Sequence, residues 1–537
     1  MFSRSALLLV VVCCWVLHGS AQELISVKTA GGPGYDWGKK VAVDASGNII
    51  ATGIFETGCL ISGVPLVSYG GIDSYVVKLD EQGELLWSRH WGGLQSEYPG
   101  GLVLDEEDNI YISGYAQWTF QMMDTTFEAD GETDAFLAKF DPEGALLWLN
   151  TIRGSGNASA KSLAYRSGHL IVGGTFDSTI VSQSDTIEAM GADDIYVASY
   201  DTDGALEWYH ACGGMGDEFL ADVATDADGR VYGTAWFDMD LSFGDTTLNT
   251  FGNRDIAVAC WDPDGTTVWV RHIYSGGTDM CFAMDADNDG NTYTIGTFTG
   301  WTNMDGQYFS SYHDLMIVKL DPVGEVVWAK FADGWNNFIG QDVEVGSDQH
   351  VYVSARFQNS ATFDGIPLNG STPYQDKGVF LELDQSGALQ WIVQSTGDGT
   401  CHPEGLFQAP NGSLLATGMV SGSVSFMDTV VQSVGSNDIF FLGLSSDGHI
   451  GYPEPLLTPE EDAFTVCSDN SQIVVVLNES CVSLSAWIEL VDPMGRLLLS
   501  QGLQGSRTRL KPIIPTGLVL VRLTLGDRVL TRKFILK

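Results

Sequence analysis

The pattern D-x-x-G-x-x-x-W recurs along this chain and constrains its fold more than any other feature. One copy reads KLDEQGELLW and ends at Trp87, and the next reads KFDPEGALLW and ends at Trp148. Six such tryptophans lie 59 to 63 residues apart, at Trp87, Trp148, Trp208, Trp269, Trp328 and Trp391. A fixed period of this length indicates an architecture built from repeated units.

Each unit contains a second turn before this one. VAVDASGNIIATG begins at Val41, and LVLDEEDNIYISG begins at Leu102. In such turns an aspartate accepts hydrogen bonds from turn N–H groups, and glycine adopts a left-handed backbone at low cost. The flanking runs alternate like strands, and no helical periodicity separates them. Each unit is therefore predicted to be a four-stranded antiparallel sheet, and such units at a fixed period predict the blades of a β-propeller.

The two ends of the repeat region complement each other. A seventh copy begins as GLSSDGHI at Gly443 and stops before its tryptophan strand. The stretch LISVKTAGG, which begins at Leu24, has the pattern of the missing strand. We therefore predict an all-β, seven-bladed β-propeller over residues 22–452. The N-terminal strand would complete the last blade and cover two strand edges.

The repeats resemble those of the bacterial seven-bladed propeller repeat family, the SBBP repeats. The resemblance rests on the run GG-x-D-x-[YF]-V-x-[KS]-[LFY]-D-x-x-G-x-x-x-W, seen from Gly70 to Trp87. It also rests on the D-x-x-G-N hairpin from Asp44 to Asn48. The resemblance implies a propeller and no particular activity, because this fold hosts many functions.

The first 21 residues have the pattern of a secretory signal peptide. Arg4 supplies the positive end, Ala6 to Leu17 form a short apolar core, and Gly19 to Ala21 form a small-residue cleavage site. The mature chain is expected to begin near Gln22. No other segment reaches the roughly 18 apolar residues of a membrane helix.

The chain changes character after the repeats. PEPLLTPEEDA forms a predicted linker over residues 453–463, and the short strands beyond it predict a small Ig-like β-sandwich over residues 464–537. From Arg496 to Lys537 the chain carries nine basic residues and one acid, Asp527. The cysteines show no disulfide framework or metal-ligand spacing, and Cys467 with Cys481 is the one candidate pair.

This region resembles the C-terminal sorting domain of the type IX secretion system of Bacteroidota. IELVDPMGRLLLSQ matches its strand–D-x-x-G–strand element, and the run from Pro515 to Lys537 matches its glycine, apolar strand and basic end. The usual PNP entry is absent, and Leu518 stands where an aromatic is common. The resemblance implies passage through the periplasm and export by the type IX machinery to the cell surface or medium. There the domain is removed or used for attachment.

The long loops of the ring define the predicted working face. Loops that join blades share one face with loops that join the second and third strands, and the other face has tight hairpins. A formal charge of −43, from 26 basic and 69 acidic residues, repels nucleic acid and anionic lipid. Candidate ligands for a sugar or cation on this face are Asp36, Glu97, Tyr98, Asp217, Asp279, Trp335 and Glu404. The alternative is that each acid caps a turn in its own repeat.

The segment DADNDGN matches the start of a calcium loop. It would place Asp285, Asp287 and Asp289 as ligands. A complete loop needs a bidentate acid at position twelve, which here is Gly296. The segment also aligns with the repeat hairpin, so a plain turn is the alternative. Calcium is the only cofactor that the sequence suggests.

The sequence contains no catalytic motif of the kinds that carry hydrolysis. Neither G-x-S-x-G nor H-E-x-x-H occurs. The first hypothesis is a secreted or surface-held binding or adhesion module whose partner is a glycan, a surface protein or a cation. The alternative is a polysaccharide hydrolase or lyase that uses acids on the long-loop face. A convergent pair of carboxylates with raised pKa in the central opening would favour the enzyme.

Overall fold

The computed structural model describes the ring and the strands of a C-terminal unit. The described residues are 23–182, 185–304, 307–334, 338–370, 375–445, 464–469, 472–477, 486–491, 497–502, 507–510, 517–525 and 528–536. The chain divides into two compact units, Met1–Gly451 and Tyr452–Lys537. No helix among the described residues is long and apolar enough to span a membrane.

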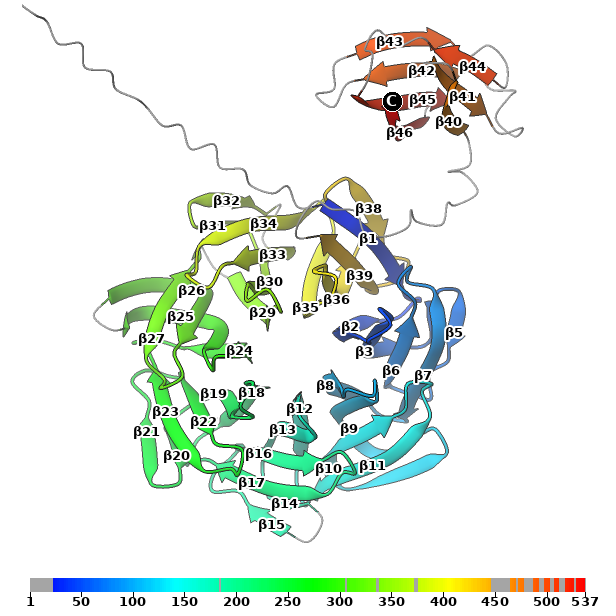
Figure 1. The fold of residues 1–537 in the computed structure, drawn as a ribbon. Coiled ribbons are helices and arrows are strands. Elements are labelled where there is room, and N and C mark those ends of the chain that lie inside the picture. Colours follow the sequence, from blue (N-terminus) through cyan, green and yellow to red (C-terminus); the bar gives the residue numbers. More distant parts are fainter. Residues whose placement is uncertain are drawn as a thin grey trace, which may run out of the picture. The chain divides into compact units, whose positions relative to one another are not determined.

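Seven sets of four antiparallel strands form a ring, which confirms the predicted propeller (Figure 1). From the inner to the outer strand, the blades are β2 (Trp37–Val43), β3 (Ile49–Glu56), β6 (Ile72–Leu79) and β7 (Leu85–Gly93); β8 (Glu97–Leu104), β9 (Ile110–Met122), β10 (Thr125–Phe140) and β11 (Leu146–Gly154); β12 (Ala158–Arg166), β13 (His169–Phe176), β16 (Asp194–Asp201) and β17 (Leu206–Cys212); β18 (Glu218–Thr225), β19 (Val231–Phe237), β22 (Asp255–Trp261) and β23 (Thr267–Ile273); β24 (Met280–Ala286), β25 (Thr292–Met304), β26 (Gln307–Leu320) and β27 (Val326–Phe331); β29 (Phe338–Val345), β30 (Val351–Phe357), β33 (Lys377–Leu383) and β34 (Leu389–Thr396); β35 (Thr400–Gln408), β36 (Leu414–Ser421), β39 (Asp438–Ser445) and β1 (Glu23–Ala30).

The N-terminal strand closes the ring. β1 runs antiparallel to β39, with Glu23 opposite Ser445 and Ala30 opposite Ile439. Figure 1 shows β1, in blue, as the outer strand of the blade that holds β35, β36 and β39. The last blade therefore takes three strands from one end of the repeat region and one from the other, so that the outer edge of β39 is paired.

The recurring tryptophan binds the turn of the next blade. Trp87 Nε1 donates to the Pro142 carbonyl oxygen at 3.1 Å, and Trp148 Nε1 donates to that of Thr202 at 3.2 Å. The same bond joins Trp208 to Pro263, Trp269 to Pro322 and Trp328 to Gln385. The turn and the tryptophan of D-x-x-G-x-x-x-W thus meet across the five boundaries between the first and sixth blades, which explains why both recur.

The glycine of this turn lies against the tryptophan ring. Gly144 has a φ of +80°, and a Cβ atom there would stand 3.0 Å from the ring of Trp87. A left-handed backbone and the close approach of an indole both require the absence of a side chain. A larger residue at this position would separate the first blade from the second.

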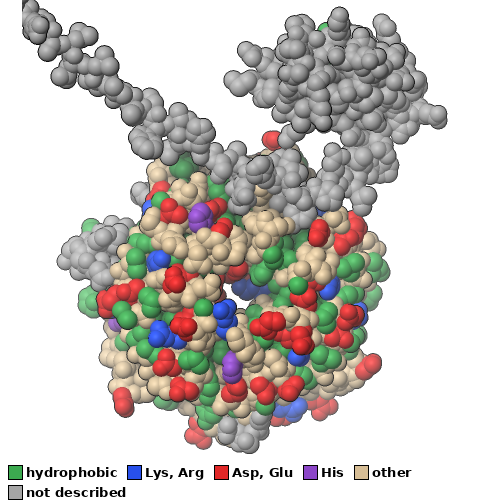
Figure 2. Space-filling view, viewed as in Figure 1, with side chains coloured by type: hydrophobic (Ala, Val, Ile, Leu, Met, Phe, Trp, Pro, Cys, Tyr) green, Lys and Arg blue, Asp and Glu red, His purple; other side chains and the backbone are tan. Residues whose placement is uncertain are grey.

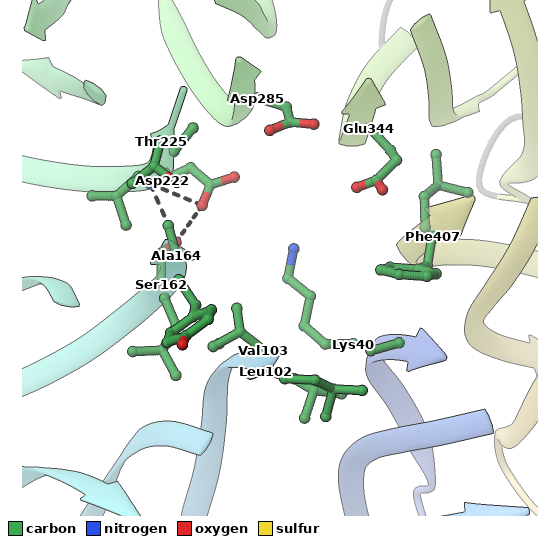
Figure 3. A pocket seen from close by; sticks show the side chains of 18 of the residues that line it. Lys40, Leu102, Val103, Ser162, Ala164, Asp222, Thr225, Asp285, Glu344 and Phe407 are labelled. Atoms are coloured by element: carbon green, nitrogen blue, oxygen red, sulfur yellow. Dashed lines mark hydrogen bonds between the residues drawn. The ribbon is translucent and has the colours of Figure 1, made fainter. Parts of the chain in front are cut away.

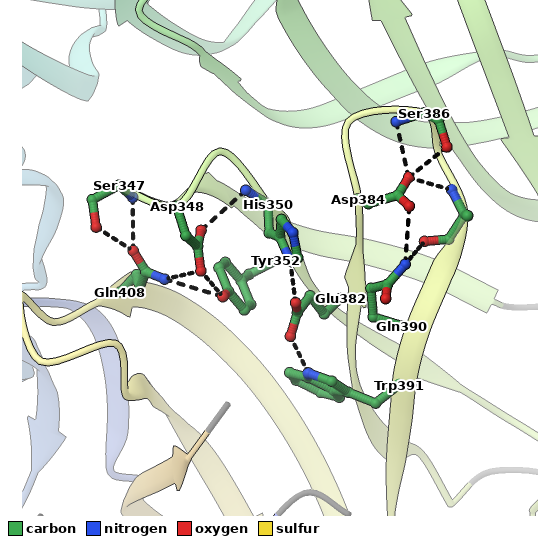
Figure 4. Close-up of polar contacts among 11 residues, drawn as sticks. Ser347, Asp348, His350, Tyr352, Glu382, Asp384, Ser386, Gln390, Trp391 and Gln408 are labelled. Carbon is green, nitrogen blue, oxygen red and sulfur yellow. Dashed lines mark hydrogen bonds and ion pairs between the residues drawn. The ribbon is translucent and has the colours of Figure 1, made fainter. Parts of the chain in front are cut away.

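Among the described residues, side-chain hydrogen bonds join the sixth and last blades (Figure 4). Trp391 Nε1 donates to the carboxylate of Glu382 in its own blade, and that carboxylate also hydrogen-bonds His350. Gln408, on the inner strand of the last blade, donates to the Tyr352 hydroxyl at 3.0 Å. The turn of the seventh repeat lies outside the described residues.

The loops between the second and third strands of the blades fold into hairpins that the sequence did not predict. They are β4 (Cys59–Ile61) with β5 (Val64–Leu66), β14 (Thr179–Ser182) with β15 (Asp185–Glu188), β20 (Asp240–Phe243) with β21 (Thr246–Asn249), β31 (Ser360–Phe363) with β32 (Ile366–Asn369), β37 (Ser423–Phe426) with β38 (Thr429–Gln432), and the far ends of β9 with β10 and of β25 with β26. β14 pairs with β11, β37 with β34, β9 with β7, and β31 with β28 (Asp333–Gly334). Through these strand pairs, the hairpins of the second, third, sixth and last blades each join their blade to the preceding one.

The hydrophobic core lies between neighbouring blades. Leu137 of the second blade packs in one buried cluster with Val172 and Tyr196 of the third. The described cysteines of the ring are free and buried, at Cys59, Cys212, Cys260, Cys281 and Cys401. Adjacent sheets therefore stabilise each other by burying apolar area, as repeat architectures require.

The second unit contains two antiparallel sheets. One is formed by β40 (Phe464–Asp469), β41 (Gln472–Leu477) and β44 (Arg507–Leu510), and the other by β43 (Leu497–Gly502), β42 (Ala486–Val491), β45 (Gly517–Leu525) and β46 (Arg528–Leu536). Ile488 and Leu490 of β42 are buried. Two such sheets are the architecture of the predicted sandwich. The predicted signal peptide and linker, and Cys481 of the candidate disulfide, lie outside the described residues.

Candidate functional site

Three of the acids predicted as ligands are buried where one blade meets the next. Asp36, Glu97 and Asp279 are at most 1% exposed. The Gly32 N–H donates to Asp36 Oδ2 at 2.6 Å, and the Gly93 N–H donates to Glu97 Oε2 at 3.1 Å. These carboxylates hold the loops that join the blades, which is the arrangement expected of turn caps.

Each of these three acids, and the buried Glu218 of the fourth blade, faces a second buried acid from the preceding blade. We call the four pairs the junction acids: Asp438 with Asp36, Asp73 with Glu97, Asp194 with Glu218, and Asp255 with Asp279. Asp73 Oδ1 and Glu97 Oε1 accept no hydrogen bond from the described residues. Burial, with repulsion from Asp73, raises the pKa of Glu97 to about 8, and burial raises that of Asp36 to about 7. At neutral pH the pair of Asp73 with Glu97 therefore holds a proton inside the ring.

The other predicted ligand residues do not join them. Asp217 is half-buried beside Glu218, which occupies the junction position of its blade. Glu404 lies 3.6 Å from the Lys39 ammonium, beside the central channel. Trp335 lies outside the described residues. The structure does not gather the predicted residues into one site.

The calcium candidates also remain apart. Asp287 Oδ1 accepts the N–H groups of Asp289 and Asn291 at 3.0 and 2.9 Å, and Asp287 Oδ2 accepts the Tyr293 hydroxyl at 3.1 Å. Asp289 is exposed, and Asp285 lines the central channel. Among the residues that the structure describes, no group of three or more His, Cys, Asp or Glu side chains is placed to hold a metal.

A cavity of about 520 Å³ lies on the axis of the ring. All seven inner strands line it, through Lys40, Leu102, Ser162, Asp222, Asp285, Glu344 and Phe407 among others. Figure 3 shows the charged ends of Lys40, Asp222, Asp285 and Glu344 pointing toward one another across this space. The space-filling view has an opening at the centre of the ring (Figure 2).

The fourth, fifth and sixth blades contribute Asp222, Asp285, Asp342 and Glu344 to the channel. Asp222, Asp285 and Asp342 each accept a hydrogen bond from a backbone N–H of the next inner strand, at 3.0, 2.7 and 2.8 Å. Lys40 Nζ lies 3.1 Å from Asp342 Oδ1. These acids therefore tie neighbouring inner strands together while they give the channel its negative charge.

Two channel acids have the electrostatics of an acid–base pair. Burial, with repulsion from Asp285 and Asp342, raises the pKa of Glu344. Burial also raises the pKa of Asp285. Carboxyl groups with raised pKa that face each other in a cavity can donate and accept protons near neutral pH. This is the feature that the sequence reasoning expected of an enzyme.

Two stacked aromatic pairs lie on the long-loop face, beyond the segments of the inner strands that line the cavity, and we call this region the mouth of the channel. Tyr98 and Tyr115 of the second blade lie 5.1 Å apart at 24°, and Phe219 and Trp236 of the fourth lie 5.4 Å apart at 11°. Within each pair, one ring stands near the start of the inner strand and the other lies directly opposite it on the second strand. Both positions border the long loops. We call these four rings the aromatic arc.

Cations lie between and beside these rings. Lys161 of the third blade bridges the two pairs, with Nζ 4.9 Å from the ring centre of Tyr115 and 5.0 Å from that of Phe219. Arg254 Cζ lies 4.1 Å from the ring centre of Trp236. Rings and cations thus alternate across three blades, at distances typical of cation–π contacts.

The same mouth continues onto the first and last blades. Lys39 Nζ lies 3.7 Å over the ring of Trp37, and Trp37 lies 5.7 Å from the His402 imidazole. His402 and Arg356 both bond Asp376, the latter at 2.8 Å. These contacts outweigh burial and lower the pKa of Asp376 to about 2. The polar groups here are already paired, in contrast to Lys161.

Of these mouth residues, only Tyr98 and Glu404 were predicted as ligands. The repeat pattern pointed to acids and aromatics on the loops between blades, not to cations. The position of Lys161 holds Lys39 in the first blade, Gly100 in the second and Ala221 in the fourth. A search for residues that break the repeat would have found Lys161 and Arg254.

The sequence has little similarity to proteins of known function. No family model matches the chain. An uncharacterized WD repeat-containing protein of Acanthamoeba polyphaga mimivirus is 21% identical over 472 residues. This match covers 67% of the chain and only 33% of the viral protein. It agrees with a propeller-type repeat and carries no activity.

Several solved structures resemble the chain weakly. The Synechocystis apocarotenoid oxygenase is 12% identical with a TM-score of 0.37, over 78% of this chain and 95% of that one. The Pseudomonas brassicacearum lignostilbene dioxygenase is 11% identical with a TM-score of 0.34, over 70% and 92%. PorZ, a surface component of the type IX secretion system of Porphyromonas gingivalis, is 10% identical with a TM-score of 0.21, over 95% and 99%. Likeness at this level says nothing about activity.

Proposed function

We propose that this chain is an exported propeller, held at the cell surface or secreted, that binds a glycan at the mouth of its channel and performs no catalysis. The aromatic arc carries the proposal. Stacked half-buried rings at the rim of a cavity offer flat apolar surfaces to the C–H faces of sugar rings, and nearby polar groups can bond the hydroxyls. The ring would supply a rigid scaffold on which these groups are already positioned.

A glycan array tests this proposal on the mature chain, residues 22–537. We expect selective binding without product formation, and about a tenfold loss of affinity in Tyr98→Ala and Trp236→Ala, because each removes one stacking surface. Trp118→Ala is the matched control, since Trp118 is 59% exposed on the extension of β9 and lies outside the arc. Equal affinity in all of these variants would exclude the arc as the binding surface.

Export by the type IX secretion system is the second part of the proposal. It is supported by the resemblance of the C-terminal unit to a sorting domain and by the signal-like first 21 residues. Deletion of residues 464–537 should leave the ring in the periplasm. If the truncated chain still reaches the surface, the C-terminal unit has another role.

The second candidate is a polysaccharide hydrolase or lyase that uses the channel acids. Asp285 and Glu344 favour it, because burial raises the pKa of both and their carboxyl groups point into the cavity from neighbouring blades. Cleavage of a bound glycan that stops in Glu344→Gln while binding persists would establish the enzyme. Binding without cleavage at pH 5 to 8 would exclude the enzyme and support the glycan-binding function.

A further inference from the structure

Two cations at the channel mouth have no acidic partner among the described residues. Lys161 and Arg254 contact aromatic rings, and neither forms an ion pair there. Other cations of the ring do form ion pairs, such as Lys78 with Asp44 at 2.8 Å and Lys330 with Asp364 at 2.8 Å. Within the described structure Arg89, Lys319 and Lys377 also form no ion pair, but each donates to a backbone carbonyl oxygen of the ring. Among the described residues, Lys161 and Arg254 have no such bond.

Leaving Lys161 without an acid has an electrostatic cost. Its side chain is half-buried, and burial together with the neighbouring Lys39 charge lowers its pKa. A partly desolvated ammonium gains most from an anion that arrives with a ligand, because no internal carboxylate competes for it. The cation is therefore available to a partner.

Neither cation is a general feature of the repeat, although Lys39 of the first blade occupies the position of Lys161 and pairs there with Glu404. The position of Arg254 is occupied by Thr133 in the second blade, by Asp193 in the third and by Asn437 in the last. The blades that lack these cations have the same strands and the same turns, so the propeller does not depend on them. Both cations instead share one rim with the four rings of the aromatic arc.

We propose that the ligand of this mouth is an acidic glycan, one whose sugars carry carboxylate or sulfate groups. The inference rests on the proposed function, because it names the class of glycan that the arc would bind. Tyr115, Phe219 and Trp236 would stack on the sugar rings. Lys161, between the two ring pairs, and Arg254, at the end of the arc, would each hold one acidic group by a charge-assisted hydrogen bond.

A nucleic acid offers the same combination of flat rings and negative charge, but the charge of the chain opposes it. A strand with a phosphate at every nucleotide would have to approach a protein of formal charge −43. An acidic glycan carries its charges more sparsely, alternates them with hydroxyls and can be uncharged over several sugars. The observations therefore favour the glycan.

The test compares acidic glycans with their own neutral forms on the full mature chain, residues 22–537. An array would carry uronate-containing and sulfated oligosaccharides beside the same chains after carboxyl reduction or desulfation, with a single-stranded oligonucleotide as a further probe. We expect the acidic forms to bind at least about tenfold more tightly than their neutral forms, and less tightly as salt rises.

Variants assign the effect to the two cations. Lys161→Gln and Arg254→Gln should each remove about tenfold of the affinity for the acidic form and leave that for the neutral form unchanged. Lys161→Arg should retain most of the binding. Lys330→Gln is the control, because Lys330 lies on the outer strand β27 and pairs with Asp364. Unchanged thermal unfolding in Lys161→Gln would show that the ring is intact.

The outcomes separate the two proposals. Preference for neutral glycans, or equal affinity of Lys161→Gln and the parent for an acidic glycan, overturns the inference and leaves the glycan-binding function standing. Preference for the oligonucleotide overturns it as well. Binding to no glycan of either kind overturns both proposals.

Discussion

The blade junctions and the channel mouth use the same strands, but the junctions carry acids that recur in the repeats and the mouth carries cations that most repeats lack. At the junctions an acid recurs at one position of the inner-strand entry, as Asp36, Glu97, Glu218 and Asp279. At the mouth, Lys161 and Arg254 differ from their counterparts in most other repeats. The recurring acids are buried and cap turns, whereas the unusual cations have no acidic partner in the described structure. Residues that recur in the repeats thus stabilise the ring. Residues that differ from the repeat are candidates for binding a ligand.

One junction shows where this rule needs refinement. Between the sixth and last blades, Lys377 stands where the other repeats have an acid, and Cys401 replaces the second acid. Lys377 is 2% exposed and donates to the carbonyl oxygens of Gly397 and Gly399 at 2.7 and 2.6 Å. It departs from the repeat yet serves the ring, because its hydrogen bonds are satisfied inside the protein. Both departure and the lack of a partner are needed to indicate a ligand site.

The largest effect is expected at a recurring acid. Asp36→Ala removes the acceptor for the Gly32 and Glu56 N–H groups at the junction that closes the ring. We expect a loss of about 2–4 kcal/mol in the free energy of unfolding, because buried donors lose their partners. Chemical denaturation measures this loss. A stable ring that had lost glycan binding would instead make Asp36 a ligand residue and would break the comparison.

A smaller loss is expected at the unusual junction. Lys377→Met keeps most of the volume but leaves two buried carbonyl oxygens without their charged donor, so we expect about 2–3 kcal/mol of destabilisation. Differential scanning calorimetry of the variant measures it, with Lys330→Met on an outer strand as the control. Wild-type stability in Lys377→Met would mean that this lysine, like Lys161, is dispensable to the ring.

The junction acids also predict an unusual pH dependence. Burial and the Asp73 charge raise the pKa of Glu97 from 4.5 to about 8, so the folded ring holds a proton that the unfolded chain has released between these values. The contribution of this protonated carboxyl to the free energy of unfolding is fully present below pH 4.5, declines as the pH rises and is lost above pH 8. The slope would reach about 1.4 kcal/mol per pH unit for one such group.

Glu97→Gln should flatten this decline, since glutamine does not titrate. Denaturation at pH 6, 7 and 8 measures the slope for the variant and for Glu143→Gln, which lies on an exposed turn. If the stability of Glu97→Gln and of the parent declines with the same slope as the pH rises, then Glu97 does not hold a proton in the folded ring.

The smallest effect is expected at the candidate calcium loop. Asp289→Ala changes an exposed side chain, so stability should stay within about 0.5 kcal/mol of the parent. Calcium titration by calorimetry should give no heat at millimolar concentration, because Asp287 already accepts protein donors at both oxygens. Heat that disappears in Asp289→Ala would restore the calcium site.

The ring could be predicted from the sequence because its contacts are periodic. The tryptophan at Trp87 and the glycine at Gly144 recur together, so the number of blades could be counted from the copies. The strand missing from the seventh copy appears at Leu24, which predicted that the N-terminal strand closes the ring. The hairpin of β14 and β15 was missed because its residues pair with β11 of another blade. Pairing across blades leaves no local pattern beyond short alternating runs.

The mouth could not be predicted because its geometry joins residues that are distant in sequence. Tyr98 was identified for its position on a long loop, but its stacking partner Tyr115 lies on the next strand, and Lys161 and Phe219 come from later repeats. Burial likewise decided the role of Glu97: an acid on a loop can face solvent or a second acid, and only the packing of two blades distinguishes them.

β1 can pair with β39 only after the rest of the ring has been synthesised. Synthesis delivers β1 first, and its partner appears only after all the other blades have been made. A chain that is interrupted before β39 keeps β1 as an unpaired strand, open to aggregation or to proteases. A finished chain conceals both edges. Whether β1 is paired therefore depends on whether the ring is complete.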